Sequence, residues 1–209
     1  MKDILTKLSS KYGCDKSDKN HLYTKIYNNI FENYRNEKFN MIEFGFGLGK
    51  SVKMWLEYFT KVKLITVDIR KLIDDLTIKR YIKKGRLEYI KSSQIDKENI
   101  IPILKKYKKF FVIIDDASHV AEDQQYTLGF AFKYVSKGGW YIIEDLKCRR
   151  NHNKLFDIEA EKTIDILTKY NETKEFKSLV LTDEQNKYIN ENIEYIDIYE
   201  KIAFIKKKG

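Results

Sequence analysis

The sequence predicts an α/β fold with a mostly parallel central sheet, helices on both faces and an antiparallel hairpin at the C-terminal end. Short apolar segments alternate with helical segments of about ten residues, a pattern typical of parallel βαβ units. Two of the apolar segments end in acidic pairs, Asp115-Asp116 and Glu144-Asp145. A glycine-rich turn, 45–49, follows the first expected strand. Open α/β sheets bind ligands at the carboxyl ends of their strands, so these features indicate an active site.

The composition fits a soluble globular protein, because 43% of the 209 residues are hydrophobic and 34% are charged. This length supports a full hydrophobic core. No apolar stretch approaches the roughly 20 residues of a membrane span. The first residues also lack the long apolar segment of a secretory signal. Two cysteines, Cys14 and Cys148, do not make a disulfide framework. We therefore expect a cytoplasmic protein without a membrane span.

The net charge of +9 comes mainly from lysines that are scattered over every segment. A nucleic-acid-binding surface is typically a clustered basic stripe that includes arginines. Arginines are few here, so we do not expect a nucleic-acid partner. A nucleic-acid-binding protein remains the alternative that this charge leaves open.

The chain starts with two helical segments, 5–10 and 21–34. We interpret residues 1–38 as an N-terminal helical extension that could form a lid or a dimer surface, which leaves a homo-oligomer open. Residues 39–209 are expected to form one globular domain, since only one proline is present and no glycine-serine linker divides it.

The domain alternates strands and helices. We expect parallel strands at 40–44, 62–67, 87–90, 110–114 and 141–143. The helices between them are expected at 51–58, 71–83, 97–106 and 123–135. Gly138-Gly139 is expected to end the last of these helices, as glycine commonly does. In the tail we expect a helix at 158–170 and two strands at 194–199 and 201–205, whose short separation predicts the antiparallel hairpin.

The turn after the first strand has the features of a nucleotide-binding turn. Glu43 precedes glycines at alternate positions, Gly45, Gly47 and Gly49. Such glycines permit a tight turn and let the backbone approach a ligand closely, although the spacing is not GxGxxG. Asp68 ends the next strand, where its carboxylate can accept both ribose hydroxyl protons.

This combination resembles the motifs of class I S-adenosylmethionine methyltransferases and implies their Rossmann-like fold. Gln94 would lie beside the adenine, where its amide could bond the base edge, although an ordinary polar loop is an alternative. Asp115 would face the methionine end of the cofactor. The residues expected at the cofactor are Glu43, Gly45, Gly47, Gly49, Ser51, Asp68, Ile69, Ser93, Gln94, Asp115 and Tyr23.

Asp116, Glu144 and Asp145 lie at the ends of neighbouring strands. Carboxylate oxygens suit magnesium, which would orient a substrate diol and lower the pKa of its hydroxyl. His119 follows Asp116 by three residues, and an ordinary histidine pKa of about 6.5 lets it take a proton. Alone, each acid could cap a helix and His119 could be structural. Together they predict a metal site at Asp116, Glu144 and Asp145, with His119 and Asp116 as catalytic residues.

The segments 116–119 and 143–146 resemble the magnesium-dependent sugar O-methyltransferases of macrolide biosynthesis, the mycinamicin and macrocin type. The same broad family includes cephalosporin-hydroxylase-like proteins. The segment Tyr12 to Lys16, followed by His21 to Tyr23 and Tyr27, resembles the N-terminal motif of that family. The resemblance covers residues 10–146. It implies S-adenosylmethionine and Mg²⁺ as cofactors, the three carboxylates as metal ligands and His119 as the base.

The loop after the second acid pair departs from that family. It carries Lys147, Arg149 and Arg150 beside the expected metal, and arginine matches phosphate by a bidentate fork. We therefore predict an anionic small-molecule acceptor: a nucleotide-linked or phosphorylated sugar, or a related phosphoryl or phosphoramidate group, in glycan or capsule biosynthesis. A solvated basic loop is the alternative.

Other function classes fit less well. An RNA methyltransferase would explain the positive charge, but the sequence shows no appended RNA-binding module. A scaffold that binds the cofactor without catalysis need not keep His119 and all three carboxylates. An iron-dependent hydroxylase typically has two histidines and a carboxylate, whereas only one histidine is expected at this site.

Overall fold

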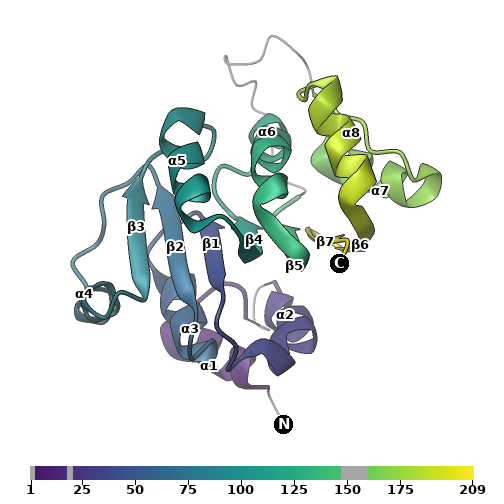
Figure 1. Ribbon diagram of the computed structural model, residues 1–209. Helices are drawn as coiled ribbons and strands as arrows, with labels where there is room; N and C mark the ends of the chain where they lie inside the picture. The colour runs from purple at the N-terminus through teal and green to yellow at the C-terminus, as the bar shows by residue number, and fades with distance from the viewer. Residues whose placement is uncertain (1–2, 18–20, 147–159) are drawn as a thin grey trace.

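The computed structural model describes residues 3–17, 21–146 and 160–209 (Figure 1). The strands are β1 Asn40–Phe44, β2 Lys63–Asp68, β3 Leu87–Lys91, β4 Phe110–Asp115, β5 Val135–Ile143, β6 Ile193–Tyr199 and β7 Ile202–Lys207. The helices are α1 Ile4–Tyr12, α2 Tyr23–Phe31, α3 Lys50–Tyr58, α4 Leu76–Lys83, α5 Lys97–Tyr107, α6 Ala121–Ala131, α7 Thr163–Thr173 and α8 Asp183–Asn192. Short 3-10 turns follow α2 at Glu32–Tyr34 and α6 at Phe132–Tyr134.

The seven described strands form one sheet in the order β3-β2-β1-β4-β5-β7-β6. Strands β1 to β5 run parallel. Strand β7 pairs antiparallel with β5, and β6 pairs antiparallel with β7. The predicted parallel sheet with a closing antiparallel hairpin is therefore confirmed.

Helices cover both faces of the sheet, as Figure 1 shows. Alternate residues of a strand point to opposite faces. In β4, Val112 and Ile114 belong to a hydrophobic cluster with residues of α1, α2 and α3. Ile113 belongs instead to a cluster with residues of α5, α6, α7 and α8. Burial on both faces explains why the parallel strands are continuous apolar segments in the sequence.

The N-terminal helices pack against the rest of the protein. Leu5 and Tyr27 share one hydrophobic cluster with Met41 and Trp55. A hydrogen bond of 2.7 Å between the hydroxyls of Thr6 and Thr24 also joins α1 to α2. The division at residue 38 and the role of the extension as a lid remain predictions.

Between residues 71 and 139 the structure corrects two expected helix boundaries. The helix expected at 71–83 begins at Leu76, because Asp75 caps it by accepting the backbone N–H of Ile78. The expectation that Gly138-Gly139 ends a helix is wrong, since both glycines lie inside β5. A side chain at Gly139 would lie 2.7 Å from the carbonyl oxygen of Phe111, where the register of β4 and β5 shifts. Glycine therefore permits a close strand approach here.

The C-terminal part holds a helix that the sequence did not lead us to expect. Helix α8 begins with a capping box, in which Thr182 and Gln185 exchange hydrogen bonds. The helix expected at 158–170 corresponds to α7, which runs later along the chain. None of the described helices combines the length and hydropathy that a membrane span requires.

Candidate active site

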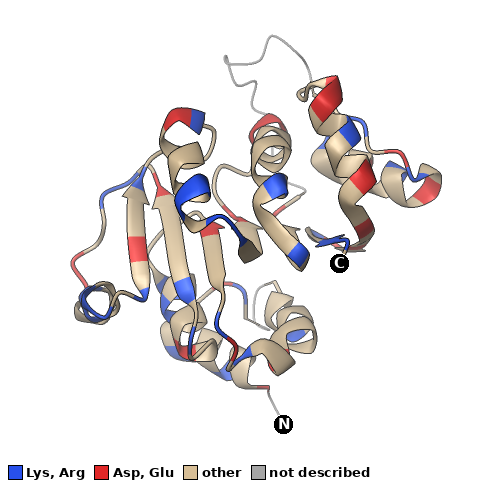
Figure 2. Cartoon of the chain, viewed as in Figure 1, with Lys and Arg blue, Asp and Glu red and all other residues tan. Residues whose placement is uncertain are grey.

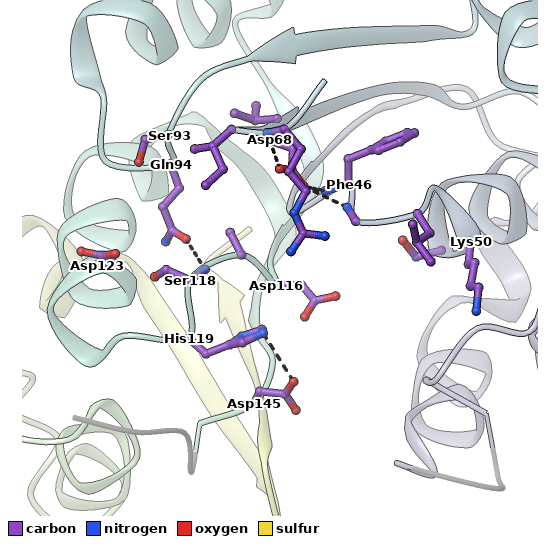
Figure 3. Close-up of a pocket in the computed structure, with 18 of the residues that line it drawn as sticks. Phe46, Lys50, Asp68, Ser93, Gln94, Asp116, Ser118, His119, Asp123 and Asp145 are labelled. Atoms are coloured by element: carbon purple, nitrogen blue, oxygen red, sulfur yellow. Dashed lines mark hydrogen bonds and ion pairs between the residues drawn. The ribbon is translucent and has the colours of Figure 1, made fainter. Parts of the chain in front are cut away.

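A cavity of about 590 Å³ opens at the carboxyl edge of the sheet, where β1, β2 and β4 end (Figure 3). Ligand sites of α/β proteins occur at this edge and commonly have this size. The glycine turn and Asp68 line one end, and the acid-bearing loops line the other. The expected site residues that line it are Gly45, Gly47, Ser51, Asp68, Ile69, Ser93, Gln94, Asp116, His119 and Asp145.

The glycine turn has two positions that constrain the site in different ways. A Cβ atom at Gly45 would lie 2.0 Å from the carbonyl oxygen of Asp116, and the φ angle there is +101°. Gly45 therefore lets the ends of β1 and β4 approach closely. Gly47, with φ +51°, has no atom within 4 Å of the place where a Cβ would stand. Its backbone therefore borders open space that a ligand can enter.

Asp68 fixes the turn. Its Oδ2 accepts the backbone N–H groups of Phe46 and Gly47, both at 2.9 Å. Its Oδ1 accepts the N–H of Arg70 at 2.9 Å. An ionised carboxylate has about four acceptor positions, so Asp68 retains capacity for a ligand hydroxyl.

Glu43, expected at the cofactor, is buried and does not line the cavity. Its carboxylate accepts hydrogen bonds of 3.1 Å from the Ser51 hydroxyl and from the Trp55 indole. Burial raises the pKa of Glu43 to about 7. In the structure Glu43 therefore joins β1 to α3.

Gln94 and Asp115 contact each other beneath the cavity. The Gln94 amide nitrogen donates to both oxygens of Asp115 at 3.1 Å and also to the Thr127 hydroxyl. Its amide oxygen accepts the N–H of Ser118 at 2.9 Å. Burial raises the pKa of Asp115 to about 8, and Asp115 does not line the cavity. Both ends of the Gln94 amide thus hold the end of β4 and the loop that follows it.

Three side chains converge at the other end of the cavity. Asp116, His119 and Asp145 each offer one ligand atom, and these atoms lie within 4.8 Å of one another. His119 Nε2 is 3.8 Å from Asp145 Oδ2, a contact that Figure 3 marks with a dashed line. His119 Nδ1 is buried and has no hydrogen-bond partner among the described residues. This group contains His119 in place of Glu144, which we expected in the metal site.

The backbone at two of these residues is unusual. His119 has φ +58° and Asp145 has φ +55°. Residues other than glycine rarely adopt this left-handed conformation, and such strain is common at functional sites. The loops after β4 and β5 therefore hold these side chains at an energetic cost.

Glu144 is buried and does not line the cavity. Its Oε2 lies 2.5 Å from the ammonium of Lys16, and its Oε1 accepts the hydroxyl of Tyr27 at 2.5 Å. Lys16 also lies 2.5 Å from Asp116 Oδ2. Burial raises the pKa of Glu144, and Lys16 opposes this rise. For Lys16, burial alone would lower the pKa, but Asp116 and Glu144 raise it well above its usual value.

The sequence interpretation did not place Lys16 or Tyr27 at the site. Tyr23, expected at the cofactor, instead donates its hydroxyl to Asp145 at 2.9 Å. The spacing of Tyr23 and Tyr27 was an available signal, since residues four apart share one face of a helix. Lys50 and Arg70 also line the cavity without having been expected there. The expected acceptor residues Lys147, Arg149 and Arg150 lie outside the described residues.

The positive charge of the described chain is dispersed. Figure 2 shows Lys and Arg on several separate helices and strands. A nucleic-acid-binding surface would gather them in one stripe.

No family model matches the sequence, but curated proteins do. Mycinamicin VI 2''-O-methyltransferase of Micromonospora griseorubida is 30% identical over 152 residues, which cover 69% of this chain and 36% of the relative. Demethylmacrocin O-methyltransferase of Streptomyces fradiae is 30% identical over 152 residues, covering 69% of this chain and 37% of the relative.

A solved structure has the same fold. MycE methyltransferase from the mycinamycin biosynthetic pathway, in complex with Mg and SAH, matches with a TM-score of 0.77 and 26% identity. The match covers 100% of this chain and 55% of the MycE chain. The chain thus spans about half of MycE and a little over a third of its curated relatives. It has the class I methyltransferase fold and is a homologue of the macrolide sugar O-methyltransferases of the mycinamicin and macrocin type.

Proposed function

We propose that the protein transfers a methyl group from S-adenosylmethionine to a hydroxyl of a sugar, with Mg²⁺ at the acceptor end. One observation carries this proposal: a single cavity joins the glycine turn and Asp68 to the group of Asp116, His119 and Asp145. The similarity to sugar O-methyltransferases, and to MycE in complex with Mg and SAH, supports the same two cofactors here.

The cofactor fits the end of the cavity that Gly47 and Asp68 line. Open space next to Gly47 lets the backbone approach the ligand, and Asp68 retains an acceptor position for a ribose hydroxyl. Ile69 is exposed and lines the cavity, so it offers an apolar surface for the adenine. Ser93 lies in the neighbouring loop.

The acid end fits a magnesium ion. Asp116 and Asp145 are partly exposed and line the cavity with hard oxygen donors, the type that magnesium prefers. When bound, the ion would hold the acceptor oxygens and lower the pKa of the reacting hydroxyl. Glu144 remains a proposed ligand, although both of its oxygens contact Lys16 and Tyr27 in this structure.

His119 is the proposed base. As the acceptor oxygen forms its bond to the methyl carbon, the carbon–sulfur bond of the sulfonium breaks and its electron pair remains on sulfur. The hydroxyl proton passes to the imidazole of His119, which borders the cavity beside Asp145, and then to solvent. Because the methyl donor is already activated, alignment of the methyl carbon and the oxygen is the main contribution of the remaining residues.

We also propose that the acceptor is an anionic sugar derivative, such as a nucleotide sugar, a sugar phosphate or a phosphoramidate, in glycan or capsule biosynthesis. Lys50 and Arg70 line the cavity and can attract an anion. The basic residues Lys147, Arg149 and Arg150, which follow the acid pair in the sequence, support the same acceptor class.

A substrate screen tests the proposal. The protein is incubated with S-adenosylmethionine, Mg²⁺ and one acceptor each from four classes: neutral macrolide glycosides, nucleotide sugars, sugar phosphates and RNA. Mass spectrometry then detects a gain of one methyl group. We expect methylation of an anionic sugar that stops when EDTA removes the metal. Methylation of macrolide glycosides alone would contradict the acceptor class, and methylation of RNA alone would contradict the proposed function.

A further inference from the structure

We infer that the N-terminal segment supplies three side chains, Lys16, Tyr23 and Tyr27, that position the carboxylates of the metal site. This inference rests on the proposed function. It makes the segment that precedes β1 a part of the active site. None of the three side chains lines the cavity, so they act through the carboxylates they bind and are positioning residues.

Helix α2 presents two tyrosine hydroxyls to the carboxyl edge of the sheet. Tyr23 and Tyr27 are four residues apart and therefore lie on the same face of the helix. The ring of Tyr23 stacks on His21, with centroids 5.1 Å apart. The ring of Tyr27 packs edge-on against Trp55 at 4.9 Å and Phe204 at 5.1 Å. These aromatic contacts restrict both rings and fix the direction of each hydroxyl.

Each hydroxyl donates a hydrogen bond to one carboxylate of the pair Glu144-Asp145. Tyr23 donates to Asp145 Oδ1 at 2.9 Å, and Tyr27 donates to Glu144 Oε1 at 2.5 Å. The other oxygen of Asp145, Oδ2, is the one that faces His119. The hydrogen bond from Tyr23 to Oδ1 thus orients the Asp145 carboxylate so that Oδ2 faces His119. Hydrogen-bond partners of metal ligands commonly have this orienting role.

Lys16 completes the arrangement between the two acidic loops. Its ammonium lies 2.5 Å from both Asp116 Oδ2 and Glu144 Oε2, and the side chain is 2% exposed. Two carboxylates this close repel each other, and the ammonium offsets that repulsion. The carbonyl of Lys16 accepts the N–H of Thr24 at 3.0 Å, which ties the lysine to α2. The strand ends of β4 and β5 are therefore bridged by one residue of the N-terminal segment.

The test measures metal affinity in the full chain. Mn²⁺ serves as the probe, and its dissociation constant is determined by electron paramagnetic resonance or calorimetry. We expect Tyr23→Phe to weaken Mn²⁺ binding about tenfold, because removing the partner of a metal ligand typically costs 10- to 100-fold in affinity. The affinity for S-adenosylhomocysteine should stay unchanged, since Tyr23 lies at the acid end. Tyr27→Phe provides a second variant with the same expectation.

Tyr58→Phe is the matched control. The hydroxyl of Tyr58 is buried in the same region and donates to Asn28, not to a carboxylate of the site. We expect this variant to lose stability without losing Mn²⁺ affinity. If Tyr23→Phe and Tyr27→Phe fold and bind Mn²⁺ like the wild type, the inference is overturned and the proposed function stands. If the wild type itself binds no Mn²⁺, the metal part of the proposed function fails and the inference fails with it.

Discussion

The ammonium of Lys16 lies 2.5 Å from Glu144 Oε2, and both side chains are only 2% exposed. This contact joins residues 128 positions apart in the sequence. Removing one partner of a buried ion pair leaves an uncompensated charge in the protein interior. The pair therefore couples the folding of the N-terminal segment to the integrity of the site.

Lys16→Met should lower the free energy of unfolding by about 3 to 5 kcal/mol, the usual cost of breaking a buried pair. Urea denaturation of the metal-free protein measures this change. Lys11→Met is the control, because the Lys11–Glu57 pair lies at the surface and contributes little. Equal effects of the two substitutions would show that the Lys16 contacts are not formed in solution.

Gly45 and Gly47 should respond differently to alanine. Gly45→Ala places Cβ 2.0 Å from the carbonyl oxygen of Asp116, so a loss of about 3 kcal/mol or more of stability is expected. Gly47→Ala meets no atom and should cost about 1 kcal/mol for its left-handed backbone. Its methyl group enters the cavity, however, and should weaken binding of S-adenosylhomocysteine. Thermal melts and calorimetric titrations separate the two effects, and identical behaviour would contradict the assigned geometry.

His119→Asn should reduce kcat by about 100- to 10,000-fold, the usual contribution of a general base. Asparagine tolerates the left-handed backbone at this position, so the loop should keep its conformation. The affinity for S-adenosylhomocysteine should not change, because His119 lies at the acceptor end. A variant with wild-type kcat would remove His119 from the mechanism.

Glu43 should make stability depend on pH. Its pKa is raised to about 7 in the folded protein by burial, against about 4.3 in an unfolded chain. Between these two pKa values, Glu43 is protonated in the folded state and ionised in the unfolded state. The stabilisation that this bound proton provides therefore falls as the pH rises and is lost above about pH 7. Urea denaturation between pH 4 and 8 measures the dependence. As the pH rises across this range, the wild type should lose stability relative to Glu43→Gln, whose amide does not titrate. A constant difference between the two proteins would contradict the raised pKa.

Local patterns in the sequence predicted much of the fold. The apolar segments that become β1, β2 and β4 are buried on both faces, and this gives them a continuous apolar signature. The expectation that Gly138-Gly139 ends a helix was wrong, because the role of Gly139 is to permit a close approach to Phe111. That approach depends on a neighbouring strand, which the local sequence does not reveal. Helix α8 is largely polar, so its capping box at Thr182 and Gln185 was its only clear local signal.

The sequence predicted at which edge of the sheet the site lies, but it did not predict the contacts between individual side chains. Asp116, His119 and Asp145 converge because neighbouring parallel strands end together. The buried contacts of Glu144 are made by Lys16 and Tyr27, which belong to a distant segment. Of these two adjacent acids, Asp145 lines the cavity and Glu144 is buried.

A crystal structure with S-adenosylhomocysteine and Mn²⁺ tests the central claim most directly, namely that one cavity holds both the methyl donor and the metal. We expect the cofactor product along Gly47 and Asp68, and an anomalous Mn²⁺ peak within coordination distance of Asp116 and Asp145. A metal peak elsewhere, or a cofactor bound away from the glycine turn, would contradict the account.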